Sequence, residues 1–332
     1  MARTSRAALS RRRKLAAVLV VAVVLAAVAT WFLGGWYRGG PLQQDRAFIV
    51  PPGAGLVVVA AKLEREGAIA SADSFLLRAR LLGSSKGIRA GEFRLPKHAS
   101  PAQVLATLQS NGVIRRLVAV PEGMPSVLVW ERLNAEPLLT GTIPVPAEGS
   151  VLPDSYAFAR GESRAAVLAR MQKAMTKTLS ELWKKRAAGL AVKTPGEAVT
   201  LASIVEKETG KSAERRTVAG LYSNRLRQGM PLQADPTIIY PITRGKPLGR
   251  RILRSEIDAT NDYNTYAMTG LPKGPITNPG RASLAAVLDP AKTQALYMVA
   301  DGTGGHAFAA TLAEHDANVV RWRAIRRARG EL

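Results

Sequence analysis

The feature that most constrains this chain is a run of 19 uncharged residues, nearly all apolar, from Leu15 to Leu33. At about 1.5 Å per residue, a helix of this length just spans the roughly 30 Å hydrocarbon core of a bilayer. Six basic residues precede the run, and none follows it directly. Because basic residues favour the cytoplasmic side, we expect residues 1–14 to be a cytoplasmic tail, residues 15–33 to be a transmembrane helix, and the remainder to lie outside the cytoplasm.

A cleaved signal peptide is the alternative interpretation of the same run. The small residues Ala27 and Ala29 fit a cleavage site that would make Thr30 the first residue of the mature chain. However, the run is longer than the roughly 7–15 apolar residues of a typical signal peptide, and Trp31 and Phe32 extend it past that site. We therefore predict an uncleaved, single-pass anchor in the cytoplasmic (inner) membrane, with the bulk of the chain in the periplasm or otherwise extracytoplasmic.

The chain carries a net charge of +22, and the six basic residues of the tail account for only part of it. An excess of positive charge outside the cytoplasm suits an anionic polymer or a membrane surface. A nucleic acid is the usual alternative partner of a basic protein. The predicted topology argues against it, and the sequence has no zinc-finger spacing or run of alternating basic and aromatic residues. We expect no nucleic-acid partner.

Cysteine is absent, and histidine occurs only at His98, His306 and His315. Disulfide bonds and thiol catalysis are therefore excluded. A zinc centre is disfavoured because it draws mainly on Cys and His ligands. We expect neither a metal nor another cofactor.

Two regions of regular structure follow the anchor. Residues 34–45 are rich in glycine and are expected to form a linker. The next region has the order strand, helix, helix, strand, helix, predicted at residues 47–50, 56–66, 74–82, 88–95 and 101–108. This order is typical of a small carbohydrate-binding module, although many α+β units share it.

The second region mixes predicted strands at 117–120 and 295–300 with predicted helices at 165–186, 195–209 and 212–228, and a basic helix closes the chain. Between them, residues 231–280 are rich in Pro, Gly, Asn and Tyr. A long irregular stretch inside a compact domain is usually functional. We therefore expect an α+β domain whose ligand-binding residues lie in this stretch.

Two glutamates close an apolar helical segment at residues 201–210. A helix advances about 100° per residue, so Glu208 shares the face of Ile204 and Val205, whereas Glu206 turns toward the polar side and is expected to face solvent. Desolvation beside apolar side chains raises the pKa of a carboxyl group. An acid still protonated near neutral pH can protonate the leaving oxygen of a glycosidic bond. Glu208 is therefore the favoured acid and Glu206 the alternative; an ordinary amphipathic helix capped by Gly210 fits the same spacing.

With these pieces assembled, the chain resembles the endolytic murein transglycosylase family, the YceG-like or MltG proteins. The segments that carry the resemblance are EGSVLPDSY (148–156), LASIVEKETG (201–210), NRLRQGMPLQADPTIIY (224–240), YNTYAMTGLPKGPITNPG (263–280) and ADGTGGHAF (300–308). No single segment is specific, but the combination is.

The resemblance implies a LysM-like βααβ module at residues 46–114 and a larger α+β catalytic domain at residues 115–332. It also implies that Glu208 is the catalytic acid. The implied activity is lytic cleavage of MurNAc–GlcNAc linkages within nascent peptidoglycan strands, which gives 1,6-anhydro-MurNAc ends and terminates elongation. It suggests peptidoglycan synthases as partners at the membrane.

The loops of these segments supply candidates for a sugar-binding cleft, since amides and carboxylates bond sugar hydroxyls and aromatic faces stack on sugar rings. The candidates are Gln233, Asp235, Asn264, Tyr266 and Asn278. Asp235 and Asn264 also fit a turn-capping role.

Three more residues are considered for the site. Glu148 and Asp154 are reserve carboxylates that could pair with Glu208, although both suit capping of their own turn. His306 follows two glycines and could approach substrate, but we expect it to be structural.

Three alternative functions are weighed against lytic cleavage. A hydrolytic muramidase normally needs a second carboxylate, whereas a lytic enzyme can work with one acid. A non-catalytic peptidoglycan-binding scaffold would rely on the small module alone. A penicillin-binding acyl enzyme is disfavoured because the chain has no Ser-x-x-Lys.

Overall fold

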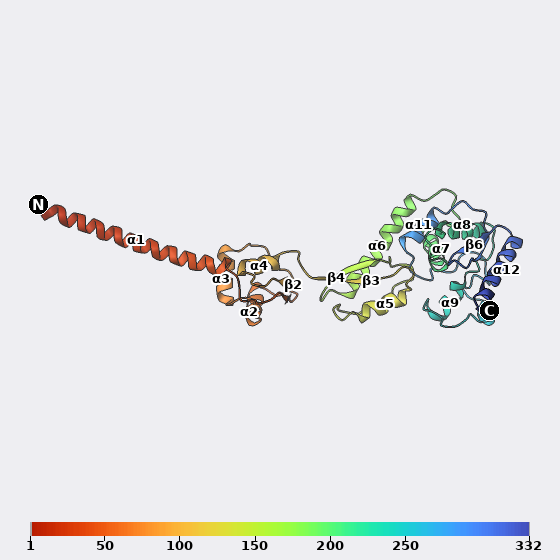
Figure 1. Cartoon of the computed structure of the whole chain (residues 1–332), viewed down its shortest axis with the longest axis horizontal. Coiled ribbons are helices and arrows are strands. Elements are labelled where there is room, and N and C mark those ends of the chain that lie inside the picture. The colour runs from red at the N-terminus through yellow and green to blue at the C-terminus, as the bar shows by residue number, and fades with distance from the viewer. Residues whose placement is uncertain (1, 332) are drawn as a thin grey trace. The chain divides into compact units, whose positions relative to one another are not determined.

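The computed structural model describes residues 2–331, which form two compact units that divide between residues 115 and 116 (Figure 1). Met1 and Leu332, the outermost residues of the expected tail and catalytic domain, lie outside the described residues, as do the side chains of residues 2–13. Both units combine helices with strands, so the expected α+β class is confirmed.

The first unit begins with one long helix, α1 (Ala2–Tyr37), which contains the whole apolar run. Its segment Lys14–Tyr37 is long and apolar enough to cross a membrane. All side chains from residue 14 to residue 30 are exposed. Because water solvates such a surface poorly, this helix fits a membrane anchor.

The rest of the first unit contains a two-stranded antiparallel sheet and three helices. β1 (Arg46–Val50) pairs with β2 (Gly91–Leu95), and Phe48 lies opposite Phe93 at the centre of the ladder. Both phenylalanines are fully buried in one apolar core. The helices are α2 (Leu56–Arg65), α3 (Ala72–Leu82) and α4 (Pro101–Gln109). The predicted element order is confirmed, with a second strand shorter than expected.

Residues 34–45, expected to be a linker, are instead part of the first unit. The ring of Trp36 is buried, with its centroid 5.8 Å from that of Phe75 on α3. Nε of Arg78 donates to the carbonyl oxygen of Phe32 over 3.0 Å, which fastens α3 to α1. The glycines around Trp36 suggested a turn, but burial of the indole outweighs their modest cost in a helix.

The second unit opens with a small sheet and two helices. β3 (Arg115–Ala119) and β4 (Ser155–Ala159) form a two-stranded sheet. Their apolar side chains pack with those of α5 (Ser126–Ala135) and α6 (Arg164–Lys184) in one core cluster, which includes Phe158 and Met171.

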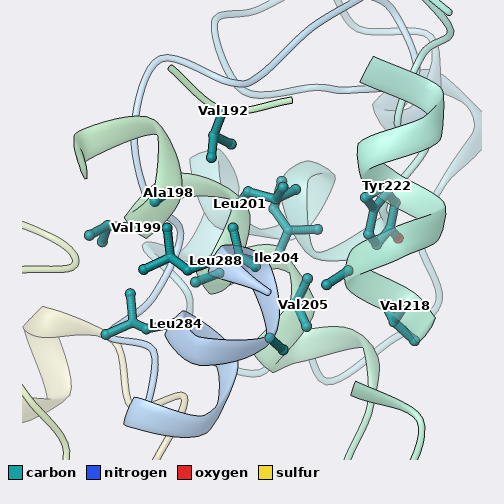
Figure 2. Packing of buried hydrophobic residues seen from close by; sticks show 14 of the residues in the cluster. Val192, Ala198, Val199, Leu201, Ile204, Val205, Val218, Tyr222, Leu284 and Leu288 are labelled. Atoms are coloured by element: carbon teal, nitrogen blue, oxygen red, sulfur yellow. The ribbon is translucent and has the colours of Figure 1, made fainter. Parts of the chain in front are cut away.

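Three helices form the larger core of the second unit. α7 (Pro195–Glu208) packs against α8 (Arg215–Arg227) and α11 (Arg281–Leu288). Figure 2 shows Leu201 and Ile204 of α7 pointing into this core, with Tyr222 of α8 and Leu288 of α11 close by. Eight consecutive residues of α7, 198–205, are buried, so its position is fixed on all sides before it ends at Glu208.

Short helices and a hairpin complete the second unit. Two short helices, α9 (Asp235–Thr243) and α10 (Arg254–Ile257), interrupt the Pro- and Gly-rich stretch. β5 (Tyr297–Ala300) and β6 (His306–Ala309) form an antiparallel hairpin, and α12 (Leu312–Ala328) packs on it. Only the first strand of the hairpin was predicted.

Candidate active site

A cavity of about 570 Å³ in the second unit brings together segments that are far apart in the sequence. Its wall is formed by the end of α7, one face of α8, the start of α9, the hairpin and α12. The polar side chains that define its chemistry are Glu208, Tyr222, Arg225, Asp235, Tyr266 and His306. This volume is in the range of small-ligand sites.

Glu208 is the last residue of α7, and its carboxyl group turns into the cavity. Its Oε1 is buried and has no hydrogen-bond partner among the described residues. Burial, together with the negative charge of Asp235, raises the pKa of Glu208 to about 7, against smaller opposing effects of the Tyr222 hydroxyl and the Arg225 cation. A large fraction of Glu208 is therefore protonated at neutral pH, as a general acid requires.

Asp235 is the second carboxylate of the cavity. It is the first residue of α9, and the hydroxyl of Tyr266 donates to its Oδ1 over 2.6 Å. Burial raises the pKa of Tyr266 well above its usual value, so this hydroxyl stays a donor. A carboxylate in the first turn of a helix is favourably placed, because the helix dipole favours negative charge there.

Arg225 shapes the wall between α8 and α9. Its Nη1 donates to the carbonyl oxygens of Pro231 and Leu232 and to Oε1 of Gln233, and its Nε donates to the carbonyl oxygen of Leu296. A buried cation with this many acceptors is held in one position. It therefore fixes Gln233 at the rim of the cavity and places a positive charge near Glu208.

His306 also reaches the cavity, from the first position of β6. Its Nδ1 lies 2.9 Å from Oε2 of Glu214, the residue just before α8. Sequence reasoning favoured a structural role for His306; the structure places its ring in the wall of the cavity that holds Glu208.

Comparison with known proteins identifies the family of this chain. The model of the YceG-like family matches residues 48–321. The chain belongs to the YceG-like family. The match covers the small module and nearly all of the second unit, including every polar residue of the cavity.

Two curated relatives carry the name endolytic murein transglycosylase. The relative from Bacillus subtilis (strain 168) is 32% identical over 217 residues, which are 65% of this chain and 57% of that protein. The relative from Streptococcus pneumoniae serotype 2 (strain D39 / NCTC 7466) is 28% identical over 321 residues, with 82% of this chain and 57% of that protein covered. The chain thus spans a little over half the length of the curated relatives it matches.

Among solved structures, a crystal structure of a yceG-like protein from Listeria monocytogenes is similar to this chain. It is 25% identical, with a TM-score of 0.49, and the match covers 83% of this chain and 99% of that chain.

The structure of this YceG-like chain places four of the candidate residues in the cavity and leaves two asparagines outside it. Glu208, Gln233, Asp235 and Tyr266 line the cavity together. Asn264 is fully buried: its Nδ2 donates to the backbone carbonyls of residues 256, 257 and 259, and its Oδ1 accepts from the backbone N of Tyr266. Asn264 therefore holds the loop that presents Tyr266 and is not available to substrate.

Asn278 is likewise a structural residue. Its Oδ1 accepts from the backbone N of Val151, and its Nδ2 donates to the carbonyl oxygen of Met124 and to Oγ of Ser126. It is fully buried, so the expectation that it lines the cleft is wrong. The side chain ties its own loop to two segments, at residues 124–126 and at residue 151, that lie more than a hundred residues earlier in the sequence.

The two reserve carboxylates do not pair with Glu208. Oε1 of Glu148 accepts from the backbone N of Ser126 over 2.8 Å, and burial raises the pKa of Glu148 to about 7. It lines two other hollows, of about 540 and 380 Å³, and not the Glu208 cavity. Asp154 is exposed and accepts from the backbone N of Ser155. The carboxylate that accompanies Glu208 is Asp235.

Glu206 is not solvated as the helical-face argument predicted. Its side chain is 6% exposed, Oε2 accepts from the backbone N of Gly280 over 2.9 Å, and Oε1 lies 3.9 Å from Nη2 of Arg215. The face of α7 that looks polar in the sequence is covered by the 275–280 loop and by the start of α8. Glu206 therefore fastens these segments and does not line the cavity.

Sequence reasoning missed Tyr222 and Arg225. Both lie on one face of α8, three positions apart, and the same face carries the buried Val218. An arginine on an otherwise apolar helix face is the signal that could have identified this pair. Among the described residues, no group of three or more His, Asp or Glu side chains is placed to hold a metal ion.

Proposed function

We propose that this protein is a membrane-anchored, endolytic peptidoglycan lytic transglycosylase. In this proposal it cleaves MurNAc–GlcNAc linkages within nascent glycan strands and leaves 1,6-anhydro-MurNAc ends, which terminate elongation. The observation that carries the proposal is Glu208, whose pKa of about 7 keeps much of it protonated inside a cavity of ligand size. The names of the curated relatives support the same activity.

The cavity groups suit the charges that develop in this reaction. Glu208 donates its proton to the glycosidic oxygen, the bond between that oxygen and the anomeric carbon breaks, and positive charge builds on the sugar ring. The carboxylate of Asp235, held by Tyr266, lies where it can offset that charge. The 6-hydroxyl oxygen of the same sugar then bonds to the anomeric carbon and gives up its proton to a base in the cavity. This attack is intramolecular and gains from high effective concentration.

Residues 1–114 determine where the protein acts in this proposal. Residues 15–33 of α1 anchor the protein with its N-terminus in the cytoplasm, so residues 46–332 lie on the side of the membrane where peptidoglycan is made. The unit at residues 46–114 acts as a LysM-like glycan-binding module, which the β1-α2-α3-β2 order supports. N-terminal sequencing of the mature protein tests the anchor, since a chain that begins at Thr30 would contradict it.

Digestion of purified glycan strands by the full chain tests the activity. We expect soluble fragments whose muramic acid ends are one water lighter than hydrolysed ends, identified by mass spectrometry. Internal cuts should shorten long strands before small fragments accumulate. A protein that binds strands and releases no fragments would be a scaffold.

A hydrolytic muramidase is the second candidate, and Asp235 is the observation that favours it. Hydrolases of this kind use a second carboxylate as base or nucleophile, and Asp235 shares the cavity with Glu208. The same mass spectra separate the two functions, because hydrolysis leaves reducing muramic acid ends.

A further inference from the structure

The ring of His306 is set into the wall of the Glu208 cavity and is mostly covered. Its side chain is 19% exposed and begins β6, directly after the turn at residues 301–305. Glu208 and Asp235 belong to the same cavity, so a sugar bound there lies within reach of both carboxyl groups and of the imidazole.

Glu214 holds this ring by two contacts. Its Oε1 accepts from the backbone N of His306 over 3.2 Å, and its Oε2 lies 2.9 Å from Nδ1. The carboxylate comes so close to the hairpin that a Cβ on Gly305 would lie 2.1 Å from Oε1, so a larger residue there would displace the carboxylate. Both the position and the rotation of the imidazole are thereby fixed.

The contacts also decide which nitrogen of the ring carries the proton. An ionised carboxylate only accepts hydrogen bonds, so Nδ1 of a neutral His306 carries the hydrogen and Nε2 carries the lone pair. Among the side chains that the structure describes, those of residues 14–331, none hydrogen-bonds to Nε2. The ring therefore presents an unused proton acceptor, with a carboxylate behind it that would stabilise an imidazolium.

The turn that carries His306 is itself held in place. Oδ1 of Asp301 accepts from the backbone N of Thr303 and of Gly305, and Nζ of Lys211 donates to Oγ1 of Thr303 over 3.0 Å. These bonds tie the hairpin turn to the segment between α7 and α8, from which Glu208 and Glu214 also emerge. The turn before His306 is therefore bonded to the segment that carries Glu208 and Glu214.

We propose that His306 is the base of the reaction and that Glu214 is its positioning residue; this rests on the function proposed above. As the 6-hydroxyl oxygen bonds to the anomeric carbon, Nε2 of His306 takes the hydroxyl proton and becomes imidazolium. Glu208 gives its own proton to the departing glycosidic oxygen. Each turnover thus leaves Glu208 ionised and His306 protonated, and one proton passes from His306 to Glu208 through solvent to restore the resting state.

Proton donation by Glu208 and proton acceptance by His306 have a chemical advantage over a single glutamate that must do both. Once it has given up its proton, Glu208 remains close to the oxygen that it has just protonated. An imidazole backed by a carboxylate can accept the second proton while Glu208 is still engaged. Loss of that base should slow the intramolecular attack and let water compete for the anomeric carbon.

The test compares full-length His306→Gln and Glu214→Gln with wild type and with Glu181→Gln, an exposed control on α6. We expect His306→Gln to lower kcat by about 10²-fold while KM stays close to the wild-type value. The fraction of reducing ends among the products should rise. Glu214→Gln should give a smaller loss of kcat and the same change of products, and the control should match wild type.

A histidine that only fastens the hairpin predicts a different result. His306→Gln would then lower the melting temperature, with kcat per folded molecule and the ratio of anhydro to reducing ends unchanged, and the proposal would be overturned. A wild-type chain that forms no anhydro ends would overturn both this proposal and the proposed function. If the wild-type chain forms anhydro ends and His306→Gln gives the same products, this proposal alone would be overturned.

A measurement on the unaltered protein covers the case in which the variants do not fold. Nitrogen-15 NMR of labelled histidine in the detergent-solubilised chain resolves three imidazoles. We expect the His306 ring to be protonated on Nδ1 and bare on Nε2 at a pH where it is neutral. The opposite tautomer would exclude Nε2 as the acceptor and overturn the proposal.

Discussion

The hydroxyl of Tyr266 donates to Oδ1 of Asp235 across 2.6 Å, which joins two loops 31 residues apart in the wall of one cavity. The two loops are also joined below this bond. The backbone N of Ala234 donates to Oγ1 of Thr265, and this hydroxyl is 2.8 Å from that of Thr237. The backbone beside Asp235 is therefore held by a buried network, and the charge of Asp235 is kept where it raises the pKa of Glu208.

Tyr266→Phe should weaken catalysis without unfolding the protein. The substitution keeps the ring and removes one hydrogen bond at an exposed site, where water can replace the lost donor at little cost in stability. We expect kcat to fall roughly 10-fold, with the melting temperature nearly unchanged. Glycan digestion and thermal melting of the same preparation measure both quantities. An unchanged kcat would mean that the position of Asp235 does not matter to the reaction.

Glu208→Gln should abolish most of the activity. The amide keeps the shape of the side chain but cannot donate the proton, so the release of anhydro ends should fall by about 10²–10⁴-fold. Folding should be preserved because the neutral amide replaces a group that is already costly to ionise. Asp154→Asn, at an exposed turn outside the cavity, is the control. A Glu208→Gln variant with normal turnover would assign the acid elsewhere.

Asp235→Asn should move the alkaline limb of the pH–rate profile. The protonated form of Glu208 is the active one, so activity should decline as pH rises through its pKa of about 7. The charge of Asp235 raises that pKa, and its removal should lower it. The activity of Asp235→Asn is therefore expected to decline at a lower pH than that of wild type. This holds whatever the maximal rate of the variant. A limb shifted to higher pH would contradict the assignment.

Glu206→Gln should affect stability more than chemistry. Gln can still accept from the backbone N of Gly280, but Arg215 loses the charge of its partner in a covered site. We expect the free energy of unfolding to fall by about 1–3 kcal/mol, with kcat per folded molecule close to wild type. Denaturation followed through tryptophan fluorescence, together with digestion assays, measures the two effects. A folded but inactive Glu206→Gln beside an active Glu208→Gln would reverse the roles of the two acids.

The sequence predicted best where local signals and burial agree. For α7, Thr194 and Pro195 mark the start, and the apolar run that follows is buried on every side, so the expected helix at 195–209 is within one residue of the observed one. The hairpin strand β6 was missed because His306–Ala309 is only four residues long and lacks clear alternation. Gly34 and Gly35 predicted a linker. The burial of Trp36 was missed because its ring packs on Phe75 of α3, which is distant in the sequence.

The candidate site was predicted in part, for a similar reason. Helix geometry put Glu208 on the apolar face, and burial does raise its pKa. The same geometry put Glu206 in solvent, because a helical projection contains no information about the 275–280 loop that covers it. Asn264 and Asn278 were candidates because side-chain amides bond sugar hydroxyls. Their hydrogen bonds to backbone groups, which only the folded chain reveals, show that they build the loops and leave the cavity to others.

The stability of the second unit should fall as pH rises from about 4.5 to about 7. Glu148 and Glu208 both have a pKa near 7 in the folded chain and about 4.5 when unfolded, so the folded state binds more protons in this window. Each group lowers the free energy of unfolding by up to about 1.4 kcal/mol per pH unit there. Carboxyls with a lowered pKa, such as Glu256 at about 2, titrate below the window.

Glu148→Gln isolates one of the two contributions. Gln keeps an oxygen to accept from the backbone N of Ser126 but cannot ionise, so about half of the stability change between pH 5 and pH 8 should disappear. Melting of the full chain in detergent, followed through Trp130 and Trp183 of the second unit, measures the difference. Glu181→Gln, on the exposed face of α6, should keep the wild-type slope. An unaltered slope in Glu148→Gln would mean that Glu148 ionises as easily in the folded protein as in the unfolded one.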